Sequence, residues 1–282
     1  MSNIKQEFLN KLKKFATELT QYVSDNVGNW KVKGFIDIEK NIYTISSDTK
    51  IISKILEIQL FPKFKEFANK NGYDIILAEM QNWYPDLSFV SKADPKIKFA
   101  VDIKTTYRLD DYDGFCNGFT FGSHGEYFRK RTSTKNIQFP YADYSAHICL
   151  GILYTRALST NIDETEILKL SNLDKINSVI KDLMFFAEEK WKISSDKGGS
   201  GNTANIGSIQ YIDDILNGNG VFLNLGEKIF DEYWINQGVL KVPDSSKKGV
   251  YKKMTKLSEF LEFKGINSSK INTVKHKRKN KE

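Results

Sequence analysis

Two short runs decide the fold of this chain: Pro85-Asp86-Leu87-Ser88-Phe89-Val90 and Phe99-Ala100-Val101-Asp102-Ile103-Lys104. Both carry β-branched or aromatic residues in alternation, which is typical of strands, and the polar segment between them contains a turn-forming Asp-Pro pair. We therefore predict a hairpin that pivots near Asp94. The pairs in this register are Asp86 with Asp102, Leu87 with Val101, Ser88 with Ala100, and Phe89 with Phe99.

Side chains alternate between the two faces of a strand, so this hairpin has one apolar face and one polar face. The apolar face holds Leu87, Phe89, Phe99, Val101 and Ile103, and the polar face holds Asp86, Ser88, Asp102 and Lys104. Directly opposed residues have Cβ atoms only ~5 Å apart, and opposed like charges destabilise a sheet. Two explanations stay open: a solvated face with Lys104 as counter-ion, or a divalent cation between the aspartates.

Chain length and charge set broad limits. The 282 residues suffice for one large α/β domain, or two small ones, with an ample core. Of the formal net charge of +7, the segment from residue 267 to the end contributes +5, through six Lys or Arg and one Glu. Basicity alone therefore does not identify a nucleic-acid partner. We predict a single domain over residues 1–265 and a basic, disordered tail over 266–282.

Several classes of site and location are disfavoured by the residue types present. Cys116 and Cys149 are too few for a disulfide framework and lack zinc-like spacing. His124 and His147 have no Ser or Cys partner at catalytic spacing, so hard carboxylates favour Mg²⁺ over zinc. The amino terminus does not resemble a signal peptide, and the longest apolar run, 148–154, is too short for a membrane span. We expect a cytoplasmic protein that does not bind membranes.

Hydrophobic periodicity predicts alternating helices and strands around the hairpin. A second helix begins at Ser47-Asp48, is kinked or divided at Pro62, and ends at Asn71-Gly72. The small hairpin over 30–45 is either simple sheet structure or a platform for a second subunit. The other predicted elements are a helix over 4–23, strands at 73–77, 147–154 and 190–193, and two or three helices within 209–265.

The segment from Lys197 to Gly207 is the richest in glycine and amide side chains. Residues 199–204 fit a dinucleotide-binding pattern, but no helix-forming sequence follows them, and no Gly-Lys-Ser/Thr closes a phosphate-binding loop. One alternative is a mobile surface loop. The other is groove recognition, because glycine permits close backbone approach and asparagine can pair bidentately with adenine.

Pro-Asp, a gap, and then Asp-x-Lys is the signature of the PD-(D/E)xK nuclease superfamily. A longer resemblance, to the EcoRV-type restriction endonucleases, rests on blocks that keep their order from about residue 40 to 210. The blocks are Ser47-Asp48-Thr49-Lys50, Gln81-Asn82-Trp83-Tyr84-Pro85-Asp86, Asp102-Ile103-Lys104-Thr105-Thr106-Tyr107, Thr134-Lys135-Asn136 and the segment 199–207. Ala204 departs from the family, which has a second threonine there, and Trp83 replaces a smaller aromatic residue.

The resemblance implies an α/β fold, with a restriction-endonuclease-like mixed β-sheet flanked by helices. It also implies a small N-terminal helix and hairpin, about residues 1–46, that contributes to dimerisation. The implied activity is Mg²⁺-dependent cleavage of both strands of double-stranded DNA by a homodimer, within a short palindrome. GATATC with a blunt cut and 5′-phosphate ends is the expected site. A cognate DNA methyltransferase is expected in the same host, without a stable complex.

Site residues follow from the resemblance position by position. The catalytic residues are Asp86, Asp102, Lys104 and Glu57, and the metal ligands are Asp86, Asp102, Glu57 and the main-chain carbonyl of Ile103. By itself, Glu57 would be taken for a surface residue of a helix. The DNA-binding residues are Gly199, Ser200, Gly201, Asn202, Thr203 and Asn205 for the major groove, Gln81 and Asn82 for the minor groove, and Thr49, Lys50, Thr105, Thr106, Tyr107 and Lys135 near phosphates.

Two alternatives to this function remain. The first is a nuclease of the same superfamily with different or relaxed specificity, such as a repair enzyme, which would not need the glycine-rich loop. The second is a sequence-specific DNA-binding module that no longer cleaves. The presence of Asp86, Asp102, Lys104 and Glu57 together argues against the second alternative.

Overall fold

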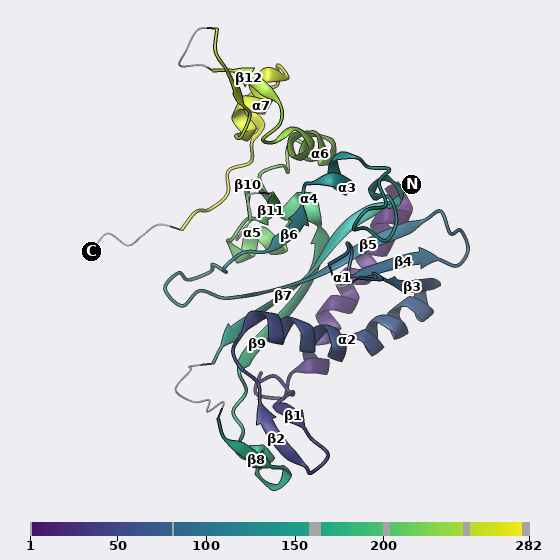
Figure 1. The fold of residues 1–282 in the computed structure, drawn as a ribbon, viewed down its shortest axis with the longest axis vertical. Helices are drawn as coiled ribbons and strands as arrows, with labels where there is room; N and C mark the ends of the chain where they lie inside the picture. The colour runs from purple at the N-terminus through teal and green to yellow at the C-terminus, as the bar shows by residue number, and fades with distance from the viewer. Residues whose placement is uncertain (1, 81, 158–164, 200–203, 245–248, 278–282) are drawn as a thin grey trace.

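A mixed five-stranded sheet forms the centre of the computed structural model, which describes residues 2–80, 82–157, 165–199, 204–244 and 249–277 (Figure 1). The strand order is β3-β4-β5-β7-β9; β5 and β7 are parallel, and the other neighbours are antiparallel. The strands are β3 (Tyr73–Leu77), β4 (Leu87–Ser91), β5 (Lys98–Tyr107), β7 (Ala146–Arg156) and β9 (Ile180–Glu189). The predicted mixed sheet flanked by helices is confirmed.

The β4–β5 hairpin has the register predicted from its sequence. Leu87 pairs with Val101, Ser88 with Ala100 and Phe89 with Phe99. The five apolar side chains predicted to share a face all lie in one buried cluster. The opposite face is only partly solvated, because Ser88 is fully buried and Asp102 is only 7% exposed, whereas Asp86 and Lys104 are half-buried.

Helices α1 (Ser2–Val23) and α2 (Thr49–Asn71) cover the apolar face of the hairpin and pack into the same cluster. The side chain of Asp48 caps α2 by accepting a hydrogen bond from the N–H of Lys50, and Asp is one of the residues preferred at this N-cap position. Gly72 ends the helix with a left-handed backbone, which glycine adopts without steric cost. Helix α2 continues through Pro62 as one helix, so the alternative of two helices divided at Pro62 is wrong.

The opposite face of the sheet is covered by the second half of the chain. Its buried cluster contains Cys149 and Leu153 of β7 together with residues of the later helices. Gly151 lies between Cys149 and Leu153 on β7. A Cβ atom at this position would approach the ring of Phe186 to 2.1 Å, so only glycine fits. The elements on this side are β6 (Thr120–Ser123), α3 (Glu126–Arg129), η1 (Tyr141–Asp143), α5 (Ile212–Leu216), α6 (Glu227–Asn236), α7 (Leu257–Phe263) and η4 (Ser268–Lys270).

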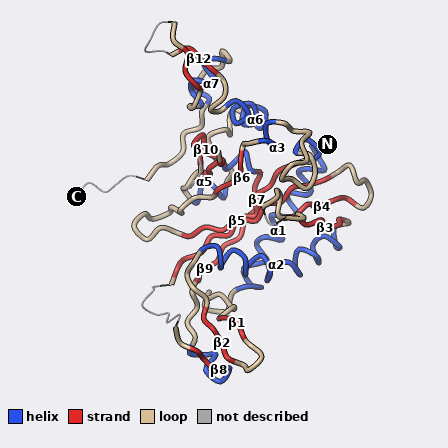
Figure 2. Tube along the Cα trace, in the orientation of Figure 1, coloured by secondary structure: helices blue, strands red, loops and turns tan. Residues whose placement is uncertain are grey.

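Small sheets lie at both ends of the long axis, apart from the central strands (Figure 2). At one end, the predicted hairpin is formed by β1 (Gly34–Ile36) and β2 (Asn41–Thr44), with β8 (Ile167–Lys169) added at its edge. The residues after β8 form η3 (Leu170–Lys175), which has no buried residue. At the other end, β12 (Lys241–Pro243) pairs with β13 (Tyr251–Lys253).

A third small sheet has the order β10-β11-β6, with β10 at Ser194–Gly198 and β11 at Asn205–Ser208. The residues before it were predicted as a strand but form a helical turn, α4 (Lys190–Ile193). The hydroxyl of Ser194 donates to the carbonyl of Lys190, which closes this turn at 2.6 Å. Lys190 and Ile193, three residues apart on one helical face, are both buried.

The predicted tail begins at residue 266, and its described part contacts the domain. The side-chain amide of Asn272 donates to the carbonyl of Asn219 at 2.8 Å, and the ammonium of Lys275 donates to the hydroxyl of Tyr211 at 2.7 Å. In the part of the chain that the structure describes, every helix is too short or too polar to cross a membrane.

Candidate active site

Three charged side chains meet where β4 begins beside β5. The ammonium of Lys104 lies 2.8 Å from Oδ2 of Asp102 and 3.4 Å from Oδ2 of Asp86. The backbone N–H of Ile103 donates to Oδ2 of Asp86 at 2.7 Å, so β5 also holds the second carboxylate in place. The predicted hairpin therefore brings Asp86, Asp102 and Lys104 together.

The charges in this group do not balance, because two carboxylates share one ammonium. Burial and then repulsion from Asp102 raise the pKa of Asp86 to about 7, against the opposing effect of Lys104. Burial disfavours the ammonium form of Lys104, but attraction to Asp102 and Asp86 outweighs it and raises the pKa of Lys104. The site is short of one positive charge.

The oxygen atoms around the Lys104 ammonium are of the type that hard divalent cations bind. The carboxylates of Asp86 and Asp102 and the carbonyl of Ile103 all lie within 3.4 Å of the Lys104 ammonium, so three oxygens converge on one cationic group. Carboxylate and carbonyl oxygens are the donors that Mg²⁺ and Ca²⁺ take. Among the described residues, no group of three or more Asp, Glu, His or Cys side chains is placed to hold a metal.

A cavity of about 660 Å³ opens beside Asp86, between α2 and the segment that joins β3 to β4. Glu57 lines this cavity, but its carboxylate lies 2.6 Å from the ammonium of Lys54. The structure therefore places Glu57 on the wall of the same cavity, with a lysine partner of its own. Sequence analysis assigned no role to Lys54 or to Ser53, whose hydroxyl lies 2.5 Å from that of Thr105.

The predicted phosphate contacts fall into two sets. Thr49, Lys50 and Thr105 line the cavity beside Asp86. Thr106 is instead buried, and the ring of Tyr107 lies under the guanidinium of Arg156 at 3.4 Å. Lys135 is exposed and pairs with Glu126 at 3.0 Å. Thr106, Tyr107 and Lys135 are not among the residues that line this cavity.

The predicted base-recognition loop joins β10 to β11. Its ends are held together because the N–H of Gly199 donates to the carbonyl of Asn205 at 2.7 Å. A Cβ atom at Gly199 would lie 3.0 Å from the Thr120 hydroxyl, so this end of the loop is closely packed. Asn82 of the minor-groove pair is exposed. The predicted residues Ser200, Gly201, Asn202, Thr203 and Gln81 lie outside the described residues.

Buried aromatic residues pack around the segment that precedes Asp86, and sequence analysis assigned them no role. Tyr84, two residues before Asp86, is buried, and its hydroxyl lies 2.9 Å from Nδ1 of His147. Burial lowers the pKa of His147, so this imidazole is neutral and structural. Lys190 of α4 lies over the ring of Tyr84, which a local sequence pattern could not indicate.

Comparisons with known proteins agree with this geometry. The family model described as "Restriction endonuclease EcoRV" matches residues 26–265. The chain is also 35% identical over 221 residues to the type II restriction enzyme EcoRV of Escherichia coli, across 78% of this chain and 87% of that protein. The matched region includes the β4–β5 hairpin, α2 and the β10–β11 turn.

Proposed function

Because the chain belongs to the EcoRV family of restriction endonucleases, we propose that it cuts both strands of DNA within a short palindrome, using Mg²⁺. The enzyme is a DNA-hydrolysing nuclease of a metal-dependent family. The observation that carries the finer proposal is the convergence of Asp86, Asp102 and Lys104 on one hairpin, where Asp86 lines a cavity.

The chain's own residues supply positioning and charge for in-line hydrolysis of a phosphodiester. Water attacks phosphorus and releases one proton to solvent, the bond to the 3′ oxygen breaks, and that oxygen takes up a proton from solvent, so the products carry a 5′-phosphate and a 3′-hydroxyl. The ammonium of Lys104 donates hydrogen bonds to the attacking water or to a phosphate oxygen, which stabilises the negative charge of the transition state. Asp102, 2.8 Å from that ammonium, holds it in the protonated form.

Asp86, Asp102 and the Ile103 carbonyl are the proposed ligands of Mg²⁺, with Glu57 as a further ligand. When bound, Mg²⁺ offsets charge on the scissile phosphate and lowers the pKa of water. The charge deficit at Asp86, whose pKa is raised to about 7 by burial and then by Asp102, supports a cation at this place. Thr49, Lys50 and Thr105, on the wall of the same cavity, are proposed phosphate contacts.

GATATC with a blunt cut is the proposed site. Its support is the resemblance of the segment Gly199-Ser200-Gly201-Asn202-Thr203 to the major-groove loop of the family, with Asn205 at its end. Asn82 and Gln81 are proposed minor-groove contacts. Tyr107 and Lys135 remain proposed DNA contacts. Thr106 remains a proposed DNA-binding residue that acts indirectly, because its side chain is buried.

A homodimer is the proposed assembly, and the small end sheet is its proposed interface. Exposed apolar side chains lie on both faces of this sheet and beside it, because neighbouring strand residues alternate between faces, and exposed apolar surface can mark an interaction site. They are Phe35, Ile36, Ile38, Tyr43, Ile167 and Leu170. Helix α1, the other part of the predicted dimerisation element, instead packs in the core. Sedimentation of an Ile36→Glu, Ile38→Glu double variant tests this assignment, which predicts a monomer.

Digestion of plasmid DNA with Mg²⁺, followed by sequencing of the fragment ends, tests the proposed activity. Discrete fragments with blunt 5′-phosphate ends at GATATC support it in full. Discrete ends at another sequence retain the nuclease and change its specificity, whereas random ends favour a relaxed nuclease of the superfamily. Specific binding without cutting would favour a module that no longer cleaves. A cognate methyltransferase that blocks cutting, without forming a stable complex, would support a restriction role.

A further inference from the structure

Lys190 is a buried lysine that the proposed catalytic steps do not use. Its side chain is 3% exposed, at the first residue of α4. Among the described residues, its ammonium has no hydrogen-bond partner. A buried ammonium without hydrogen bonds destabilises a folded protein, so its presence here calls for a specific reason.

Three aromatic rings surround this ammonium. It lies 5.3 Å from the ring centre of Tyr84, 5.4 Å from that of Phe128 and 6.0 Å from that of Tyr141. A cation within about 6 Å of a ring face is attracted by the negative charge of that face. The contact with Tyr84 reaches the segment that carries a catalytic carboxylate, because Tyr84 immediately precedes Pro85-Asp86.

The backbone of the same residue belongs to the path that leads to the base-recognition loop. Helix α4 is followed directly by β10, which ends at Gly198, next to the first residue of that loop. The carbonyl of Lys190 accepts from the hydroxyl of Ser194 at the start of β10. The carbonyl of Ile193 accepts from the N–H of Ile209 at 3.0 Å, just after β11. Both strands that hold the loop are therefore tied to α4.

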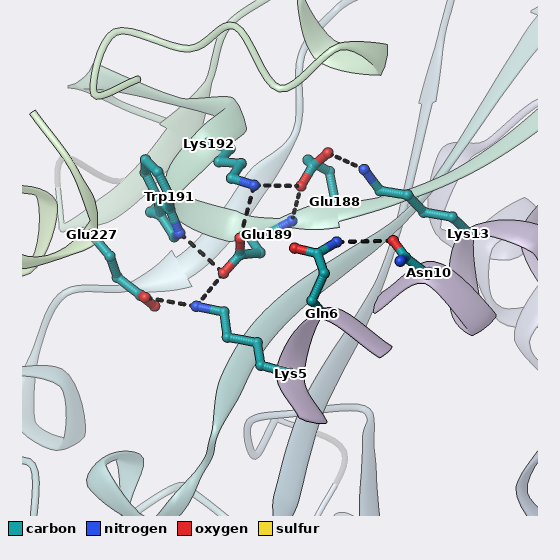
Figure 3. Close-up of polar contacts among 9 residues, drawn as sticks. All are labelled: Lys5, Gln6, Asn10, Lys13, Glu188, Glu189, Trp191, Lys192 and Glu227. Atoms are coloured by element: carbon teal, nitrogen blue, oxygen red, sulfur yellow. Dashed lines mark hydrogen bonds and ion pairs between the residues drawn. The ribbon is translucent and has the colours of Figure 1, made fainter. Parts of the chain in front are cut away.

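Ion pairs also hold the residues next to Lys190 in the sequence (Figure 3). Glu189, the residue before Lys190, pairs with Lys5 of α1 and with Lys192 of α4. The indole N–H of Trp191 donates to the same carboxylate at 3.2 Å. These contacts attach the start of α4, next to Lys190, to helix α1.

The charged groups around Lys190 come from several elements. Burial lowers the pKa of Lys190 to about 8; Asp102 and Asp231 act against this shift, and Lys104 and Arg131 add to it. Arg131 is itself paired with Asp231 at 2.7 Å and shares two of the rings with Lys190. The neighbouring His147 is neutral because burial lowers its pKa.

We propose that Lys190 is a positioning residue that couples the base-recognition loop to the catalytic carboxylate Asp86, through its contact with the ring of Tyr84. This inference rests on the proposed function, because it requires a chain that cuts DNA at a preferred sequence. In this proposal, a change in β10 and β11 on DNA binding reaches α4 through the bonds of Ser194 and Ile209, and reaches the segment before Asp86 through the contact of Lys190 with Tyr84.

Lys190→Met tests the coupling, because methionine keeps the apolar packing and removes the charge. Lys98→Met is the matched control: Lys98 lies over a single ring, that of Phe139, at 5.2 Å, and is half-buried. Melting temperature is measured at pH 7 and pH 9, without DNA. Single-turnover cleavage is measured on the preferred site and on the same site with one altered base pair, at saturating enzyme.

The coupling predicts that Lys190→Met melts at a higher temperature than wild type at pH 7. The difference in melting temperature should be smaller at pH 9, because Lys190, with a pKa of about 8, is then mostly uncharged in the folded wild type. It also predicts at least about a tenfold slower cleavage of the preferred site, as for a misplaced catalytic group, and a smaller loss on the altered site. Binding of the preferred site and the control variant should stay at wild-type values.

Two outcomes would overturn the assignment. Wild-type rate and preference in Lys190→Met would show that the charge does not position Asp86. A lower melting temperature, with equal losses on both sites, would show a purely structural lysine. Failure of the wild-type protein to cut at a preferred sequence would instead contradict the proposed function, and that result is obtained before any variant is made.

Discussion

Two groups of carboxylates and lysines in this molecule are built from the same residue types in different proportions. At the edge of the β4–β5 hairpin, Asp86 and Asp102 share the single ammonium of Lys104. Where β9 meets α4, three carboxylates meet three lysines (Figure 3). That second group consists of Glu188, Glu189 and Glu227 with Lys5, Lys13 and Lys192.

The difference in proportion reverses the direction of the pKa shift for Glu189, although for Glu227, in the same group, burial prevails and the pKa is raised. Burial alone would raise the pKa of both Asp86 and Glu189. For Asp86 the neighbouring Asp102 adds to burial, and the pKa rises to about 7. For Glu189 the hydrogen bonds and charges of Lys5 and Lys192 outweigh burial, and the pKa falls. A balanced group behaves as a structural clamp, whereas an unbalanced group facing a cavity is suited to take up a cation.

The largest expected effect comes from Asp102→Ala, which removes one proposed ligand and the closest partner of Lys104. Mg²⁺-dependent cleavage should fall by at least about 10²–10³-fold, the loss typical for removal of one transition-state stabiliser. DNA binding should persist, because a negative charge has been removed. Single-turnover cleavage and a gel-shift titration measure the two properties.

Asp74→Ala is the control for this variant, since Asp74 is an exposed carboxylate on β3 whose lysine partner, Lys92, lies 3.5 Å away. It should cut at the wild-type rate. Cleavage by Asp102→Ala at a rate near that of the control would contradict the assignment of the hairpin as the catalytic centre.

The unbalanced group could be predicted from the sequence, whereas the balanced one could not. Alternation and a turn-forming Asp-Pro pair determine the register of the hairpin, so its faces follow from local pattern alone. The ion pairs of Lys5 join residues more than 180 positions apart, and no periodicity reports such contacts. The segment 190–193 was wrongly predicted as a strand because four residues are too few to distinguish a strand from a helical turn.

Long-range contacts also explain why the burial of Lys190 was not expected. The rings around its ammonium belong to residues 84, 128 and 141, which are brought together only by the folded sheet. Glu57 shows the complementary limit. The family resemblance places it among the ligands, and the helix period cannot say whether its carboxylate faces Asp86 or pairs along α2 with Lys54, as it does here.

The next largest effect should come from the balanced group. Lys5→Met leaves Glu227 without its ammonium and Glu189 with Lys192 as its remaining lysine partner. Breaking a buried ion pair costs about 3–5 kcal/mol. Because Lys5 is partly exposed, we expect its loss to lower the free energy of unfolding by about 2 kcal/mol. Urea denaturation measures the change.

Lys11→Ala is the matched control on the same helix, because Lys11 pairs with Glu7 at the surface. An exposed pair contributes less than about 1 kcal/mol, so this variant should unfold close to wild type. Equal destabilisation by the two substitutions would show that the balanced group is not a structural clamp.

A smaller effect is expected in the pH dependence of stability, which should have opposite signs for Asp86 and Glu189. The pKa of Asp86, about 7 in the folded protein, lies above its unfolded value, so the folded state holds a proton that the unfolded state loses from about pH 4 upward. Stability from this residue is therefore present at low pH and is lost as the pH rises through 7. Glu189 behaves oppositely, since its pKa is lowered and its contribution is lost only as the pH falls.

Asp86→Asn mimics the protonated carboxyl and should reveal this dependence. Without metal, the variant should be more stable than wild type by about 1–2 kcal/mol at pH 8, with a smaller difference at pH 5. Added Mg²⁺ should stabilise wild type and reduce the difference at pH 8. A difference that grows towards pH 5 would mean that Asp86 behaves like a balanced carboxylate.

The smallest effect on stability, and the finest test of the comparison, concerns Glu57. This residue faces the cavity of the unbalanced group but has a lysine of its own, Lys54, which is 57% exposed on its side chain. Lys54→Ala should change the free energy of unfolding by less than about 0.5 kcal/mol, as expected for a surface pair on one helix. If Glu57 is a further ligand, loss of its partner frees the carboxylate, and half-maximal cleavage should need less Mg²⁺. An unchanged Mg²⁺ requirement, together with full activity of Glu57→Gln, would assign Glu57 to the ordinary surface pairs and leave Asp86, Asp102 and the Ile103 carbonyl as the proposed ligand set.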